Sequence, residues 1–176
     1  MPCSRARHLL LLAALVLTTV GCDQATKHVA RQALADGSSG PLLGGFVHFT
    51  LAHNSGGFLG LGDSLSPRLR LFIFTVATSV FLVAALVAVI RSRPSINSRA
   101  GFGLALLAAG GFGNLIDRLG QQGLVTDFCT LHLGSLHTGV FNVADVAIVL
   151  GAALIMIAVP HARAGYHSGV DCRHIN

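Results

Sequence analysis

The chain has 176 residues, of which 52% are hydrophobic and only 11% are charged, against roughly 25% charged residues in an ordinary soluble domain. The formal net charge is +5, but the basic residues are scattered among apolar runs and form no stripe interleaved with aromatics, which argues against nucleic acid as a partner. The composition excludes an ordinary water-soluble fold, and we expect a single integral membrane domain over residues 1–176.

Apolar runs follow one another along the chain. A helix needs about 20 apolar residues to cross a hydrocarbon core of about 30 Å. The first run, residues 9–22, is shorter, so it either continues as a helix or forms the apolar part of a signal peptide. We expect an all-α membrane fold of four transmembrane helices, with spans at about 8–26, 69–90, 100–117 and 139–159 and external segments at about 27–67 and 118–138.

Basic residues give the orientation, because short loops rich in Lys and Arg stay on the cytoplasmic side. Seven of the 12 lie before the first run, between the second and third, or after the fourth: Arg5, Arg7, Arg91, Arg93, Arg99, Arg163 and Arg173. Five lie on the alternate side: Lys27, Arg31, Arg68, Arg70 and Arg118. This modest bias predicts that both termini are cytoplasmic.

The two external segments contain turn-forming glycines. In the first, Val47, Phe49 and Leu51 alternate with more polar residues, the two-residue period of a strand with one buried face. A small sheet at the membrane surface is therefore expected, and the second segment should fold back on that surface. A disulfide between Cys22 and Cys129 is compatible with this topology.

All seven acidic residues are aspartates, and Asp145 lies inside the fourth apolar run. A carboxylate at the centre of a transmembrane helix costs about 2.5–3.5 kcal/mol, so it needs a partner or a function. If the helix starts at Gly139, Asp145 lies about 9 Å along it, at 1.5 Å per residue. Asn142, three residues earlier, would then share its helix face.

Asn114 and Asp117 repeat this spacing at the end of the third run, near Gly110, Gly111 and Gly113. One interpretation is a polar contact between helices, with Asp117 and Arg118 as a structural ion pair. The other is a pair of carboxylates that shares one proton and works as acid and base, as in aspartic proteases. Spacing nominates Asp145 with either Asp117 or Asp127 and does not choose between them.

The segments "DQATK", "NSGGFLGLG", "GGFGNLIDRL", "LVTDF" and "FNVADVAI", in this order, resemble the lipoprotein signal peptidases, or signal peptidase II. The likeness runs over nearly the whole chain. It implies a four-span aspartic endopeptidase of the bacterial inner membrane, with a small periplasmic sheet and an extended loop, which cuts diacylglyceryl-modified lipoprotein precursors before the lipidated cysteine. Its partners would be these precursors and membrane lipid, and no cofactor is implied.

The same resemblance assigns the catalytic pair to Asp127 and Asp145. It makes Asp117 and Arg118 supports of the site. Positions that match pocket-lining residues are Asp23, Lys27, Asn54, Gly56, Gly110, Asn114 and Asn142.

The chain departs from the family pattern at two points. Where the family often has Asn-x-Gly-Ala-Ala-Phe, this chain reads "NSGGFL", which moves Phe58 one position early, and tryptophan, frequent before the "FN" pair, is absent. The stretch "TTVGC", which ends at Cys22, looks like a lipoprotein cleavage site. We interpret it as part of the first span, because Asp23 and Lys27 after it match the enzyme's own pattern.

Three alternatives remain from the residues alone. A small proton or cation transporter, or a channel subunit, could use Asp145 and Asn142, but no polar residue continues toward the cytoplasmic end. Cys129, His132 and His137 have spacing suited to zinc but lack an evident fourth ligand, so we expect no metal site. A lipoprotein anchored at Cys22 would be more polar after that residue.

Overall fold

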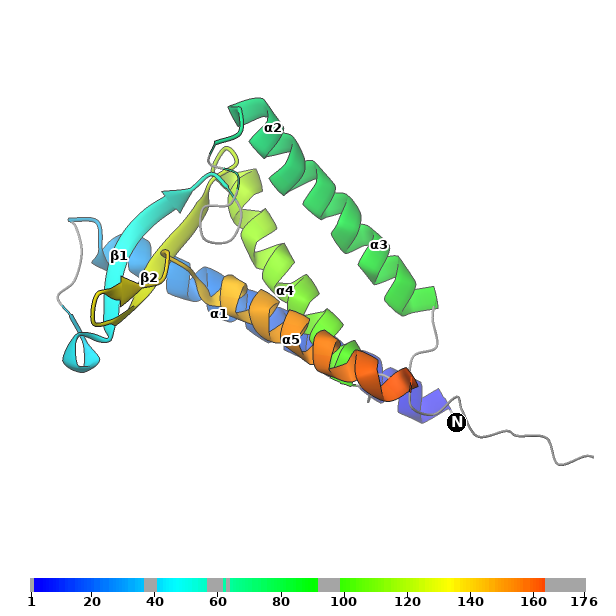
Figure 1. Cartoon of the computed structure of the whole chain (residues 1–176). Coiled ribbons are helices and arrows are strands. Elements are labelled where there is room, and N and C mark those ends of the chain that lie inside the picture. The colour runs from blue at the N-terminus through cyan, green and yellow to red at the C-terminus, as the bar shows by residue number, and fades with distance from the viewer. Residues whose placement is uncertain (1, 37–40, 57–61, 63, 92–98, 164–176) are drawn as a thin grey trace, which may run out of the picture.

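The computed structural model describes residues 2–36, 41–56, 62, 64–91 and 99–163. Its helices are α1 (Pro2–Ala33), α2 (Pro67–Leu71), α3 (Thr78–Arg91), α4 (Arg99–Gly120) and α5 (Val143–Arg163). A π-helical turn, Phe72–Ala77, joins α2 to α3. The strands are β1 (Val47–Asn54), β2 (Val125–Leu133) and β3 (Leu136–His137). Figure 1 shows α1, α4 and α5 packed along one another, with the sheet at the end of the bundle farthest from the N-terminus.

Close helix packing depends on glycines in α4 and α5. A Cβ on Gly103 would lie 2.7 Å from the carbonyl oxygen of Gly151, and one on Gly151 would lie 2.5 Å from that of Gly103. On another face of α4, Gly111 lies against Leu82, which brings α3 alongside. Since interhelical packing in membranes relies on such small residues, the glycine-rich third run forms the centre of the bundle.

Three helices in the described part of the chain are long and apolar enough to cross a membrane: Leu10–Ala33, Pro67–Ala84 and Arg99–Gly120. A fourth apolar stretch, Val143–Ala158, is shorter. The first helix runs without a break through Cys22, and it continues beyond the expected end at residue 26. Lys27 therefore lies within α1, and Ala30 and Leu34 after it pack with Phe128 of β2.

The predicted strand is confirmed: β1 covers Val47–Asn54, and Phe49 and Leu51 pack against the core formed by Ala30, Leu34 and Phe128. The second external segment does more than fold back, since residues 125–133 form a nine-residue strand antiparallel to β1. The register pairs Ala52 with Asp127 and Asn54 with Val125, with an irregularity between Phe49 and Ala52. Phe58 lies outside the described residues.

Candidate active site

The first turn of α5 is fixed by a reciprocal cap. The Asn142 Oδ1 accepts a hydrogen bond from the Asp145 N–H at 2.9 Å, and the Asp145 Oδ2 accepts one from the Asn142 N–H at 3.2 Å. This is the geometry of a capping box, here formed by Asn and Asp. Both residues are buried, so the cap fixes the position of the Asp145 carboxylate inside the protein.

The expected position of Asp145, about 9 Å along a helix that starts at Gly139, is wrong. Phe141 exchanges backbone hydrogen bonds with Cys129 of β2, so the chain is still extended there and α5 begins at Val143. Asp145 lies in the first turn, and Asn142 precedes the helix as its cap instead of sharing a helix face with it.

Asp127 lies on β2 and is held by two side-chain amides. The Asn142 Nδ2 donates to its Oδ1 at 2.6 Å, and the Asn54 Nδ2 donates to its Oδ2 at 3.0 Å. Burial raises the pKa of Asp127 to about 6, and the nearby Asp145 charge adds to the increase, whereas the two amides act in the opposite direction. A carboxyl group with this pKa can hold a proton under mildly acidic conditions.

Asn114 and Asn142 connect the two carboxylates. The Asn114 Nδ2 donates to the Asp145 Oδ1 at 2.9 Å, and its Oδ1 accepts from the Asn142 Nδ2 at 3.1 Å. Asn142 thus donates from its side chain toward Asp127 and from its backbone toward Asp145. The structure brings Asp127 and Asp145 to opposite sides of one asparagine.

A buried ion cluster lies beside this pair. The Lys27 ammonium, fully buried, is 2.8 Å from the Asp23 Oδ2 and 3.2 Å from the Asp117 Oδ2. It also donates to the Asn114 Oδ1 at 2.9 Å, which directs the Asn114 amide nitrogen toward Asp145. Asp23 in addition accepts the Ala144 N–H at 2.9 Å.

The four aspartates that are buried in the described part of the chain therefore fall into two kinds. Asp23 and Asp117 are paired with a lysine, whereas Asp127 and Asp145 are hydrogen-bonded to neutral amides. The Lys27 ammonium therefore ties Asp23 and Asp117 into a buried ion cluster, whereas neither Asp127 nor Asp145 contacts it directly. The Asp127 and Asp145 pair is the one whose surroundings suit exchange of a proton.

Arg118 does not form the ion pair with Asp117 that one interpretation of the sequence allowed. Its Nη2 donates to the Gly56 carbonyl at 2.8 Å, and its guanidinium lies over the Phe74 ring. The Gly56 N–H in turn donates to the Asn54 Oδ1 at 2.8 Å, which turns the Asn54 amide nitrogen toward Asp127. Arg118 thus supports the loop that carries an Asp127 partner.

Gly110 is the point where α4 approaches the start of α5 most closely. A Cβ there would lie 2.4 Å from the Ala144 carbonyl oxygen. All eleven residues singled out from the sequence are therefore brought into one region by hydrogen bonds, ion pairs or backbone packing: Asp23, Lys27, Asn54, Gly56, Gly110, Asn114, Asp117, Arg118, Asp127, Asn142 and Asp145.

Sequence reasoning missed Gln24 and Thr126. The Gln24 Nε2 contacts the Gly113 carbonyl, Asp23 and Asp117 at 3.0–3.2 Å. The Thr126 N–H donates to the Asp117 Oδ2 at 2.9 Å, and its hydroxyl accepts from Arg31. Both stand beside residues that were singled out, in "DQATK" and "VTDF", but a neutral polar residue in such a motif gives no signal of its own.

The histidines of the second external segment do not gather around a metal position. The His132 ring stacks on His137 and lies against His48, and among the described residues no three His, Cys, Asp or Glu side chains form a group that could hold a metal ion. Cys22 and Cys129 are free thiols, so the alternative disulfide is absent.

Residues 15–160 match the family model described as Signal peptidase (SPase) II. The chain belongs to this family. It is 39% identical to a lipoprotein signal peptidase of Desulforapulum autotrophicum over 141 residues, an alignment that covers 80% of this chain and 85% of the relative. A lipoprotein signal peptidase of Moorella thermoacetica is 37% identical over 147 residues, or 83% of this chain and 88% of the relative.

Solved structures agree with this assignment. A bacterial membrane enzyme determined by the in meso method at 2.3 Å superposes with a TM-score of 0.75 at 26% identity, over 92% of this chain and 94% of that one. The chain is accordingly a protease of the signal peptidase II family, a family of multi-pass membrane enzymes. The transporter alternative is not supported.

Proposed function

We propose that this chain removes signal peptides from diacylglyceryl-modified lipoprotein precursors, cutting before the lipidated cysteine, with Asp127 and Asp145 as its catalytic pair. The observation that supports this residue assignment is that Lys27 contacts two of the buried aspartates, Asp23 and Asp117, and not the other two. Asp117, the other partner that spacing allowed for Asp145, lies 3.2 Å from the Lys27 ammonium. Asp127 instead shares Asn142 with Asp145.

The proposed reaction uses one proton shared by the pair. The ionised aspartate takes a proton from water as the water oxygen attacks the scissile carbonyl carbon, and the protonated aspartate donates to the carbonyl oxygen. The tetrahedral diol then collapses, the C–N bond breaks, and the cysteine amine leaves with a proton. In this scheme Asp127, with its pKa raised to about 6, holds the shared proton, and Asp145, oriented by the Asn114 amide, takes the proton from water.

The remaining site residues have supporting roles in this proposal. Asn54, Asn114 and Asn142 orient the two carboxylates, and Lys27 acts through Asn114. Asp23, Asp117, Arg118 and Gly56 fix the elements that carry them, and Gly110 lets α5 approach α4.

We further propose four membrane crossings in the bacterial inner membrane, with α5 as the fourth and both termini in the cytoplasm. The sheet and the candidate site then lie at the periplasmic end of the bundle. The position of Asp145 in the first turn of α5 supports this arrangement, since the lipid chains of a substrate can stay in the bilayer while its scissile bond meets the carboxylates.

The test is cleavage of a diacylglyceryl-modified precursor by the purified full chain. Asp127→Asn and Asp145→Asn should each lose cleavage, whereas Asp36→Asn, an exposed aspartate on the segment after α1, should retain it. Thermal unfolding in detergent checks that the variants are folded. Full activity of folded Asp127→Asn would transfer the catalytic role to Asp117 and refute the assignment.

A further inference from the structure

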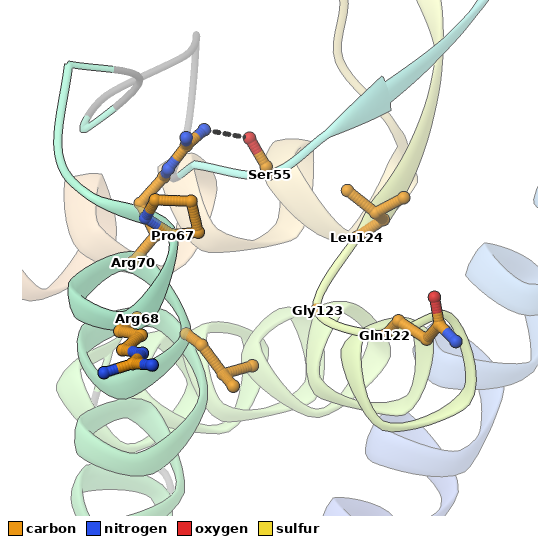
Figure 2. Close-up of a pocket in the computed structure, with 8 residues that line it drawn as sticks. Ser55, Pro67, Arg68, Arg70, Gln122, Gly123 and Leu124 are labelled. Atoms are coloured by element: carbon orange, nitrogen blue, oxygen red, sulfur yellow. Dashed lines mark hydrogen bonds between the residues drawn. The ribbon is translucent and has the colours of Figure 1, made fainter.

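A cavity lies outside the candidate active site, between the end of β1, the start of α2 and the turn that joins α4 to β2. Its volume is about 360 Å³, and its lining includes Ser55, Arg68, Arg70, Leu71, Gln122 and Gly123. Figure 2 shows Ser55 and Arg70, joined by a hydrogen bond, on the side opposite Gln122, Gly123 and Leu124. None of these residues takes part in the proposed reaction.

The lining of this cavity is suited to an anion. Its described residues bring two arginines and no carboxylate, together with the Ser55 hydroxyl and the Gln122 amide. Arg68 is exposed, so its guanidinium is accessible to a ligand. The planar guanidinium matches the geometry of phosphate oxygens and makes strong, charge-assisted hydrogen bonds with them.

The helix surface next to the arginines is suited to hydrocarbon. Leu69, Phe72, Val76 and Val80 are large apolar side chains that remain exposed on the continuous helix from α2 to α3. Phe72 is four residues after Arg68, which puts the two on one helix face. The candidate membrane span Pro67–Ala84 begins at the cavity, so the charged lining lies at one end of an apolar surface long enough to face lipid.

We propose that this cavity binds the phosphodiester headgroup of an anionic phospholipid, whose acyl chains lie along the exposed face of α2 and α3. A ligand with a phosphate and two acyl chains matches both the arginine-lined cavity and the apolar surface that adjoins it. Free phosphate shares only the first of these features. The proposed role is distinct from the peptidase activity, because the cavity lining includes none of the eleven residues placed in the candidate active site.

The test is retention of lipid by the full chain in native mass spectrometry, with dioleoyl phosphatidylglycerol and dioleoyl phosphatidylcholine added separately in detergent. The wild type should retain phosphatidylglycerol in preference to phosphatidylcholine. Arg68→Gln should weaken phosphatidylglycerol retention about tenfold, as expected for loss of a hydrogen bond to a charged group. Arg70→Gln should also weaken phosphatidylglycerol retention.

The matched control is Arg99→Gln, which removes another exposed arginine, at the end of α4 away from the cavity. This variant should retain phosphatidylglycerol like the wild type. Equal retention of the two lipids, or an equal loss in Arg68→Gln and Arg99→Gln, would overturn the proposal in favour of general surface attraction. Displacement of phosphatidylglycerol by inorganic phosphate would overturn the lipid assignment and identify a simple anion site.

Discussion

Replacing Gly110 by alanine tests how closely α4 must approach the start of α5. The added Cβ would lie 2.4 Å from the Ala144 carbonyl oxygen and 2.8 Å from the Ile148 Cγ1. An ordinary carbon–oxygen contact is about 3.3–3.6 Å, so the first turn of α5 must move by about 1 Å. Neither neighbour is the free end of a flexible side chain, and overpacking of this kind costs about 1–3 kcal/mol.

Because Asp145 follows Ala144 directly, this movement also displaces the carboxylate from Asn114 and Asp127. A misplacement of about 1 Å can reduce a catalytic rate about 100-fold. We expect Gly110→Ala to lower kcat for precursor cleavage by about that factor. The assay is single-turnover cleavage by purified enzyme, with thermal unfolding in the same detergent to measure the loss of stability.

Two glycine controls separate catalysis from folding. Gly103→Ala overpacks the same helix pair, at 2.7 Å from the Gly151 carbonyl oxygen, but two turns from Gly110, so it should lower stability with a smaller effect on kcat. Gly21→Ala on α1, where a Cβ meets nothing within 4 Å, should leave cleavage unchanged and stabilise the helix by up to about 1 kcal/mol. A kcat for Gly110→Ala equal to that of the wild type would refute the inference that the contact between Gly110 and Ala144 positions Asp145.

Three further predictions concern the carboxylates and their partners. Because the folded pKa of Asp127 is about 6, above its ordinary 3.8, the folded chain keeps a proton that the unfolded chain loses. The free energy of unfolding should therefore fall by up to about 3 kcal/mol as the pH rises from about 4 to about 6, and a pH series of denaturation in detergent should find this fall absent in Asp127→Asn. Lys27→Met leaves Asp23 and Asp117 buried without their cation and should lower the free energy of unfolding by about 3–5 kcal/mol in the same denaturation assay. The control, Arg31→Met, should lower it by only about 1 kcal/mol. Equal stability of the two variants would contradict the ion cluster. Asn54→Ala removes a hydrogen-bond donor to Asp127 and should lower kcat about tenfold or more. The control, His53→Ala, changes the exposed neighbour and should leave kcat unchanged. Equal kcat values for the two variants in the cleavage assay would count against a role for Asn54.

The sequence predicted the apolar helices and β1 because their signals are local. Uninterrupted apolar runs and the alternation of Val47, Phe49 and Leu51 are visible within a few residues. The boundaries that depend on tertiary contacts were not predictable. Nothing local indicates that α1 continues past Lys27 to meet Phe128, or that Phe141 pairs with Cys129 and delays α5 to Val143.

The site shows the same difference between features with a local sequence signal and features set by tertiary contacts. The spacing of Asn142 and Asp145 indicated an interacting pair, although the geometry is a helix cap and not a shared helix face. Spacing could not separate Asp117 from Asp127, because the distinction comes from Lys27, which lies 90 residues or more away in sequence. Gln24 likewise acquires its contacts only because Gly113 lets α1 and α4 approach.

The central claim, a proton shared between Asp127 and Asp145, can be measured by infrared difference spectroscopy of the full chain in detergent. At pH 5, below the raised pKa of Asp127, we expect a protonated carboxyl band that disappears in Asp127→Asn and persists in Asp36→Asn. A band that persists in Asp127→Asn but is lost in Asp117→Asn would contradict the account, because the shared proton would then belong to the residue that contacts Lys27.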